Sequence, residues 1–192
     1  MTRKRILKLM LVISIFGSLF SNIAVCQETP YDFSFKLSIS DRPGELSYLG
    51  LPKDVQEFSL DQIDAKIVLI EIFSMYCPIC QREAAPINEL FQRIQQDNYL
   101  GDRVRVIGIG AGNSDFETQF FKSNYAIPFP LFSDADFVIH KQVNEVGTPH
   151  FFGLHIIPGE TPRLFFPHAG PIKDLQVFIN NFKNAARQEA GQ

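Results

Sequence analysis

Two cysteines separated by two residues stand where a continuous apolar run meets a segment with helical periodicity. The run covers residues 67–73, and Glu71 alone interrupts it. An apolar run of this length predicts a central strand that is buried on both faces. Cys77 and Cys80 follow, with Pro78 between them in a position that suits the first turn of a helix. The chain is therefore expected to leave a buried strand and enter a helix with both thiols near the helix N-terminus.

The hydrophobic pattern predicts an alternation of strands and helices along the rest of the chain. Alternating apolar residues favour a strand over 31–39, and residues 41–44, Asp-Arg-Pro-Gly, favour a turn after it. Beyond residue 58, strands are expected at 67–73, 104–109, 129–132, 151–157 and 163–166, and helices at 78–98, 115–125, 135–143 and around 175–182. This order predicts an α/β fold with a central mixed sheet, helices on both of its faces and an N-terminal strand extension.

The first 26 residues have the composition of a secretory signal. Basic residues at 3–5 precede an apolar run over 9–20, and small and polar residues continue to Cys26. The run is shorter than the roughly 20 residues that span a bilayer, which favours cleavage over an uncleaved anchor. A third alternative is lipidation of Cys26, because residues 23–26 resemble a bacterial lipoprotein box, although Val25 stands where a small residue is usual. Each alternative takes the chain out of the cytoplasm and into a compartment in which thiols can be oxidised.

The expected organisation is one main domain with short additions at both ends. We expect a signal peptide or anchor at 1–26, an N-terminal extension at 27–57, the main domain at 58–188 and a tail at 189–192. The first 26 residues hold four of the 18 basic residues and none of the 21 acidic ones, which leaves a net charge of −7 on the remainder. A body this acidic repels phosphate backbones, so nucleic acid is not an expected partner.

The position of the two thiols favours redox chemistry over metal binding. A cysteine at a helix N-terminus is stabilised as a thiolate by the unsatisfied N–H groups and the helix dipole. Cys80 lies about one turn after Cys77, close enough to form a disulfide with it. Structural zinc needs four ligands, and the sequence has no second CxxC or HxxxH pair that could complete the set. No metal and no cofactor are expected.

The combination of motifs resembles a known family. The segment 58–60, the strand 67–73, the Cys77–Cys80 motif, Glu83 and Thr148-Pro149 together resemble extracytoplasmic thioredoxin-like proteins of the TlpA/ResA class. The resemblance runs from residue 58 to the C-terminal helix. Two departures are visible in this part of the chain: a tyrosine precedes the first cysteine where the class usually has tryptophan, and the helix proline falls six residues after the second cysteine where five is usual.

The resemblance implies a thioredoxin-like domain that acts as a thiol–disulfide oxidoreductase on protein substrates outside the cytoplasm. It implies that Cys77 is the attacking thiol and Cys80 the buried resolving thiol, so that a mixed disulfide forms through Cys77 and is broken by Cys80. Tyr76, Thr148 and Pro149 are then expected at the substrate-binding surface. The resemblance favours reduction of substrates, a redox partner protein that restores the thiols, and a periplasmic or membrane-anchored location.

Two acids near the cysteines are candidate proton carriers. Glu71 lies six residues before Cys77 and matches the buried acid that exchanges a proton with the resolving thiol in thioredoxins. Burial without a partner raises the pKa of a carboxyl group, which suits a proton acceptor near neutral pH. The alternative is an ion pair near a sheet edge with a cation such as Lys66. Glu83, three residues after Cys80, matches an acid common in the class, but an acid early in a helix also favours the helix dipole.

The downstream proline carries two further expectations. The Thr148–Pro149 bond is expected to be cis, beside the cysteines, with the preceding backbone free to pair with a substrate chain. The rival function is copper handling, because Cys77, Cys80 and His150 could form a thiolate and imidazole site. Sco-type copper chaperones resemble this arrangement, but they use a CxxxC spacing that this chain lacks.

Overall fold

The computed structural model describes residues 31–39 and 42–190 of the 192-residue chain. The predictions of a signal peptide, an anchor or lipidation at Cys26 lie outside the described residues. Among the residues that are described, no helix is both long and apolar enough to cross a membrane.

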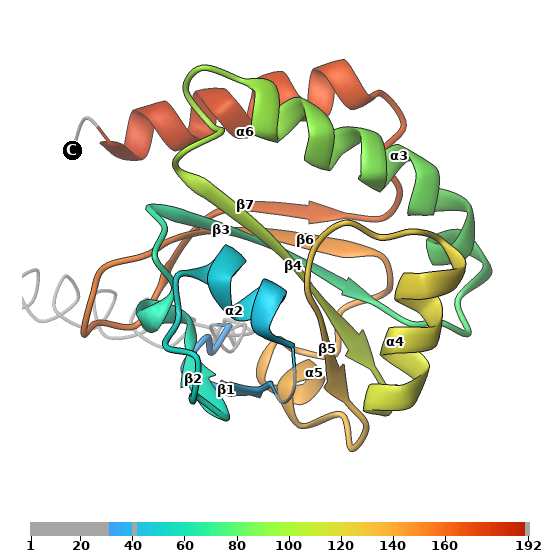
Figure 1. The fold of residues 1–192 in the computed structure, drawn as a ribbon. Coiled ribbons are helices and arrows are strands. Elements are labelled where there is room, and N and C mark those ends of the chain that lie inside the picture. The colour runs from blue at the N-terminus through green and yellow to red at the C-terminus, as the bar shows by residue number, and fades with distance from the viewer. Residues whose placement is uncertain (1–30, 40–41, 191–192) are drawn as a thin grey trace, which may run out of the picture. The chain divides into compact units, whose positions relative to one another are not determined.

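A five-stranded mixed sheet forms the centre of the fold, with the strand order β5-β4-β3-β6-β7 (Figure 1). Its strands are β3 Ile67–Phe73, β4 Val104–Ala111, β5 Leu131–Asp134, β6 His150–His155 and β7 Arg163–Ala169. β3 pairs in parallel with β4 and antiparallel with β6. All seven residues of β3 are buried, which confirms the prediction of a central strand covered on both faces.

Helices cover the sheet from both sides. α3 (Pro78–Gln96) and α6 (Leu175–Ala190) lie together on one face, and their apolar residues share a core cluster with β3 residues Leu69 and Phe73. Buried Phe121 of α4 (Asp115–Asn124) belongs to the same cluster. The opposite face is covered by α2 (Pro43–Leu49), α5 (Val138–Gln142) and the segment that begins at residue 31 (Figure 1). The predicted α/β fold with a mixed sheet and helices on both faces is confirmed.

The N-terminal part differs from the prediction in two respects. The expected strand over 31–39 is reduced to β1 (Lys36–Ser38), which pairs with β2 (Glu57–Ser59) in a separate two-stranded sheet. The alternation itself was informative, because the apolar residues from Phe33 to Ile39 are buried at every second position. The turn expected at 41–44 is wrong, since Pro43 opens helix α2.

The remaining boundaries shift by a few residues. β4 extends to Ala111, two residues past its expected end, and β5 starts at Leu131, two residues late. Ser114 caps α4 as expected: its side chain accepts a hydrogen bond from the N–H of Glu117, whose carboxylate accepts the N–H of Ser114. β6 and β7 form the antiparallel pair that was expected around residues 158–159.

Candidate redox site

The two cysteines occupy different environments at the N-terminus of α3. Cys77 is the N-cap residue and is partly exposed, whereas Cys80 is one turn into the helix and only 1% exposed. Both thiols are free, and the backbone N–H of Cys80 donates to the Cys77 sulfur over 3.4 Å. The junction predicted from the sequence therefore places an accessible thiol at the helix tip and a second thiol directly beneath it.

Their surroundings shift the two thiol pKa values in opposite directions. Partial burial acts to raise the pKa of Cys77, but hydrogen bonds with Thr148, with the Cys80 thiol and with backbone N–H groups outweigh it and hold the pKa below its usual range. Burial raises the pKa of Cys80, and the hydrogen bond with Cys77 and the neighbouring Glu71 act in the same direction. Cys77 is thus the more readily ionised of the two thiols, and Cys80 the one that holds its proton more firmly.

The segment before β6 lies against Cys77. The Thr148–Pro149 peptide bond is cis, as predicted. The Cys77 sulfur is 3.4 Å from the carbonyl oxygen of Thr148, so residues 71 positions apart in the chain meet at the site. On the far side, the carbonyl oxygen of Pro149 accepts the N–H of Gly170, which follows β7.

Glu71 lies in the interior of the central strand. It is 5% exposed and is paired with Gly108 of β4 on one side and Phe151 of β6 on the other. Side chains alternate along a strand, so Glu71 shares the face of Leu69 and Phe73, against which α3 packs. Burial raises its pKa from 4.5 to about 8, and the charges of Glu83 and Cys77 add to that rise.

The alternative of an ion pair at a sheet edge is wrong for Glu71. β3 is the third of five strands, not an edge strand. Lys66 lies before the first residue of β3, five residues and therefore roughly 16 Å along the strand from Glu71.

Glu83 is the second buried acid of the site. It is 9% exposed, one turn of α3 beyond Cys80, and its Oε2 accepts the backbone N–H of Ile172 over 2.8 Å. Ile172 precedes α6, so the carboxylate joins two helices. An acid that only favours the helix dipole can stay exposed to solvent, whereas Glu83 is buried. The structure thus brings Glu71 and Glu83 together with Cys80 on one face of the sheet.

Polar side chains hold the segment that leads into Cys77. The side-chain oxygen of fully buried Asn113 accepts the N–H of Met75 over 2.8 Å, and the side-chain amide of Gln81 donates to the Met75 carbonyl over 2.8 Å. The hydroxyl of Tyr76 donates to the carboxylate of Glu117 on α4. No sequence pattern pointed to Asn113, which is 38 residues from Met75 in the chain and becomes its partner only because β4 ends beside β3.

The three candidate copper ligands do not converge. His150 shares its face of β6 with Phe152, whose ring centroid is 4.6 Å away, whereas Cys80 lies on the opposite face with Phe151. Within the described ranges, no group of three His, Cys, Asp or Glu side chains could hold a metal ion. The copper site expected as a rival is therefore not formed by these residues.

The fold and the paired thiols define the class: this is a thioredoxin-like α/β domain with a CxxC motif at the start of its main helix. The chain belongs to the AhpC/TSA family, which it matches over residues 40–166. It is 24% identical over 119 residues to the thiol-disulfide oxidoreductase ResA of Halalkalibacterium halodurans. That match spans 61% of this chain and 60% of the length of ResA.

Solved structures support the same fold. A secreted Mycobacterium tuberculosis disulfide oxidoreductase homologous to Escherichia coli DsbE aligns with a TM-score of 0.55 at 18% identity, covering 79% of this chain and 96% of its own. StoA from Bacillus subtilis aligns with a TM-score of 0.50 at 17% identity, covering 67% and 89%. At these identities the likeness establishes the thioredoxin-like fold.

Proposed function

We propose that this protein is a thiol–disulfide oxidoreductase that exchanges disulfides with protein substrates through Cys77 and Cys80. The observation that carries the proposal is the contrast between the two thiols. One is accessible with a lowered pKa, and the other is buried with a raised pKa. Exchange needs a thiolate that can reach the substrate and a second thiol that stays protected until the first has reacted.

The reaction proceeds in two steps. The Cys77 thiolate attacks one sulfur of the substrate disulfide and forms a bond with it, while the other substrate sulfur leaves as a thiolate and takes a proton from solvent. Cys80 then gives up its proton, and its sulfur attacks the Cys77 sulfur and releases the second substrate thiol. The substrate gains two electrons, which the cysteine pair loses on forming its own disulfide. A partner protein with a dithiol restores the reduced pair.

Glu71 is the proposed acceptor of the Cys80 proton. It lies on the face against which Cys80 packs, and its pKa of about 8 leaves a fraction of the carboxyl groups ionised near neutral pH. The neighbouring charge of Glu83 contributes to that pKa, so Glu83 acts through Glu71 and is a positioning residue.

Tyr76, Thr148 and Pro149 are the proposed substrate-binding residues. An open hollow of about 370 Å³ lies beside Tyr76 and Thr148 and is lined mainly by apolar atoms, including the ring of Phe137. A substrate chain that lies extended along Thr148 would place its cysteine at the Cys77 sulfur and a neighbouring side chain in this hollow.

We further propose that the protein works outside the cytoplasm and reduces its substrates. The signal-like composition of residues 1–26 supports export, and one of the similar solved structures is that of a secreted oxidoreductase. The direction is tested by the reduction potential of the Cys77–Cys80 couple, for which we expect a value near that of thioredoxin, about −270 mV. A value near the roughly −120 mV of strong disulfide-forming catalysts would contradict the reductase direction.

The activity itself is tested by the reduction of insulin by dithiothreitol, followed as turbidity from the released chains. The purified protein should accelerate the reaction, and Cys77→Ser should abolish the acceleration. Equal acceleration by wild type and Cys77→Ser would contradict the proposed function.

A further inference from the structure

Helix α4 presents two phenylalanines to solvent on the side opposite its core contacts. Phe116 is 79% exposed and Phe120 is 52% exposed, and their stacked rings have centroids 6.5 Å apart. They are four positions apart in the chain, so they share one face of the helix. Thr118 and Phe121, on the other side, are the buried residues of α4. Phe116 and Phe120, called here the α4 aromatic pair, therefore lie outside the core.

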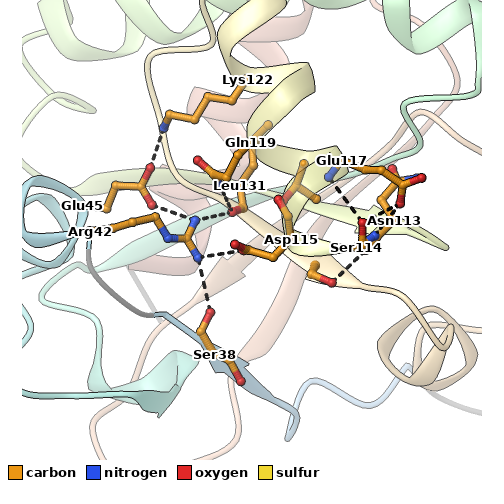
Figure 2. Close-up of polar contacts among 12 residues, drawn as sticks. Ser38, Arg42, Glu45, Asn113, Ser114, Asp115, Glu117, Gln119, Lys122 and Leu131 are labelled. Atoms are coloured by element: carbon orange, nitrogen blue, oxygen red, sulfur yellow. Dashed lines mark hydrogen bonds and ion pairs between the residues drawn. The ribbon is translucent and has the colours of Figure 1, made fainter.

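One flank of α4 is fixed to the N-terminal part of the chain (Figure 2). Lys122 forms an ion pair with Glu45 at 2.7 Å, and Asp115 forms one with Arg42 at 3.5 Å. Arg42 also pairs with Glu45 and donates to the carbonyl oxygen of Leu131 over 2.8 Å. This network sets the orientation of the helix without any contribution from the aromatic pair.

The other flank of α4 is joined to the redox site. Glu117, next to Phe116 in the chain, caps the helix together with Ser114 and accepts a hydrogen bond from the hydroxyl of Tyr76. Tyr76 is 65% exposed and immediately precedes Cys77. Glu117 thus links the residue beside the reactive thiol to the helix that carries the α4 aromatic pair.

The surroundings of this surface are acidic. The side chain of Asp115 is 64% exposed, and the hydrogen bonds that Glu117 accepts from Tyr76 and Ser114 hold the pKa of that carboxyl below its usual range. The two cations of this cluster, Arg42 and Lys122, are paired with Glu45 and Asp115, so that together with Glu117 the five side chains carry a net charge of −1. A partner that covers the pair therefore meets apolar rings beside negative charges.

We propose that the α4 aromatic pair is a docking surface for the substrate protein, which covers it with an apolar segment that also carries basic residues. The inference rests on the proposed function, because disulfide exchange brings the substrate into direct contact with Cys77 and hence over Tyr76. Large apolar side chains on an exposed helix stabilise a complex when a partner removes them from water. The net negative charge beside the pair favours basic over acidic segments.

The test uses synthetic peptides whose single cysteine is blocked by a coloured thionitrobenzoate group. Each peptide carries an eight-residue arm of alternating Leu and Lys, Leu and Glu, or Gly and Ser. An arm of this length reaches roughly 28 Å when extended, enough to pass from Cys77 across Tyr76 to α4. Release of the coloured thiol by the reduced protein gives a second-order rate constant for each peptide.

We expect the Leu/Lys peptide to react about five- to tenfold faster than the Gly/Ser peptide with the wild type, and the Leu/Glu peptide to lose part of this advantage. The double variant Phe116→Gln/Phe120→Gln should remove the advantage and leave the Gly/Ser rate unchanged. Val177→Gln, a matched change of an exposed apolar residue on α6, should keep all three rates. Equal rates for the three arms with the wild type, or an advantage that survives the double substitution, would overturn the proposal.

Two other occupants are tested with the same variants. A wild-type dimer in sedimentation velocity that the double variant dissociates would show that a second copy of this chain covers the pair. Cosedimentation with phosphatidylglycerol vesicles that the double variant loses would show a lipid surface instead. Either result overturns the proposal. A failure of the proposed function is distinct, because no peptide would then react faster with the wild type than with Cys77→Ser.

Discussion

Glu71 of β3 and Glu83 of α3 lie within electrostatic reach of each other, and both are nearly excluded from solvent. Glu83 also accepts the backbone N–H of Ile172, which lies between β7 and α6. The charge of Glu83 adds to the burial that raises the pKa of Glu71 to about 8. The proposed role of Glu71 as proton acceptor for Cys80 depends on this raised pKa.

The first prediction concerns stability and pH. Because the pKa of Glu71 is raised in the folded state, the fold favours the protonated acid, and stability is lost as pH rises from about 4.5 through 8. We expect Glu71→Gln to unfold with a free energy close to that of the wild type at pH 5 and to be more stable by several kcal/mol at pH 9. Urea denaturation at both pH values measures this. A variant that is less stable at pH 9 would place Glu71 in a structural ion pair.

The second prediction concerns the resolution step. If Glu71 accepts the Cys80 proton, the rate at which a preformed mixed disulfide on Cys77 is resolved should rise with pH around 8 in the wild type. Glu71→Gln should slow resolution near neutral pH by about a hundredfold, the lower end of the usual contribution of a general base. Alkylation of Cys77 should change far less, because its hydrogen bonds with Thr148 and Cys80 remain. An unchanged rate across the pH range would remove Glu71 from the mechanism.

The third prediction separates Glu83 from Glu71. Glu83→Gln keeps an oxygen that can accept the N–H of Ile172 but removes the charge that raises the pKa of Glu71. The pH at which resolution is half-maximal should therefore move to a lower value, while the maximal rate is retained. The same resolution assay measures the midpoint. A midpoint that stays in place would mean that Glu83 has only a structural role.

The fourth prediction concerns the N-terminus. Expression of the chain with its own first residues in a bacterial host should give a mature protein that begins near Gln27, read by intact-protein mass. An added acyl mass that Cys26→Ser abolishes would establish a lipoprotein instead. A chain that retains Met1 would establish an anchor.

Local sequence patterns were sufficient for the parts of the fold that depend on neighbours in the chain. The apolar run with its single acid marked β3, the two cysteines and Pro78 marked the start of α3, and Thr148-Pro149 marked the cis bond. In each case the signal and its physical cause lie within a few residues of each other.

The parts that could not be predicted depend on tertiary contacts. α2 is only seven residues long and opens with Pro43-Gly44, whose composition favours a turn, and it becomes a helix whose buried leucines pack on the sheet. Asn113 joins the site only through the parallel pairing of β3 with β4. The exposure of Phe116 and Phe120 could not be predicted either, because the helical pattern of α4 is also compatible with burial of each residue.

The central claim is that Cys77 attacks and Cys80 resolves, and trapping the mixed disulfide tests it most directly. Reduced Cys80→Ser and Cys77→Ser are each exposed to insulin and analysed by non-reducing mass spectrometry. The account predicts that Cys80→Ser accumulates an insulin chain linked to Cys77, because the accessible thiolate reacts and no second thiol releases it. Cys77→Ser should accumulate almost none, because Cys80 is buried and its pKa is raised. Equal trapping by both variants, or preferential trapping at Cys80, would contradict the account.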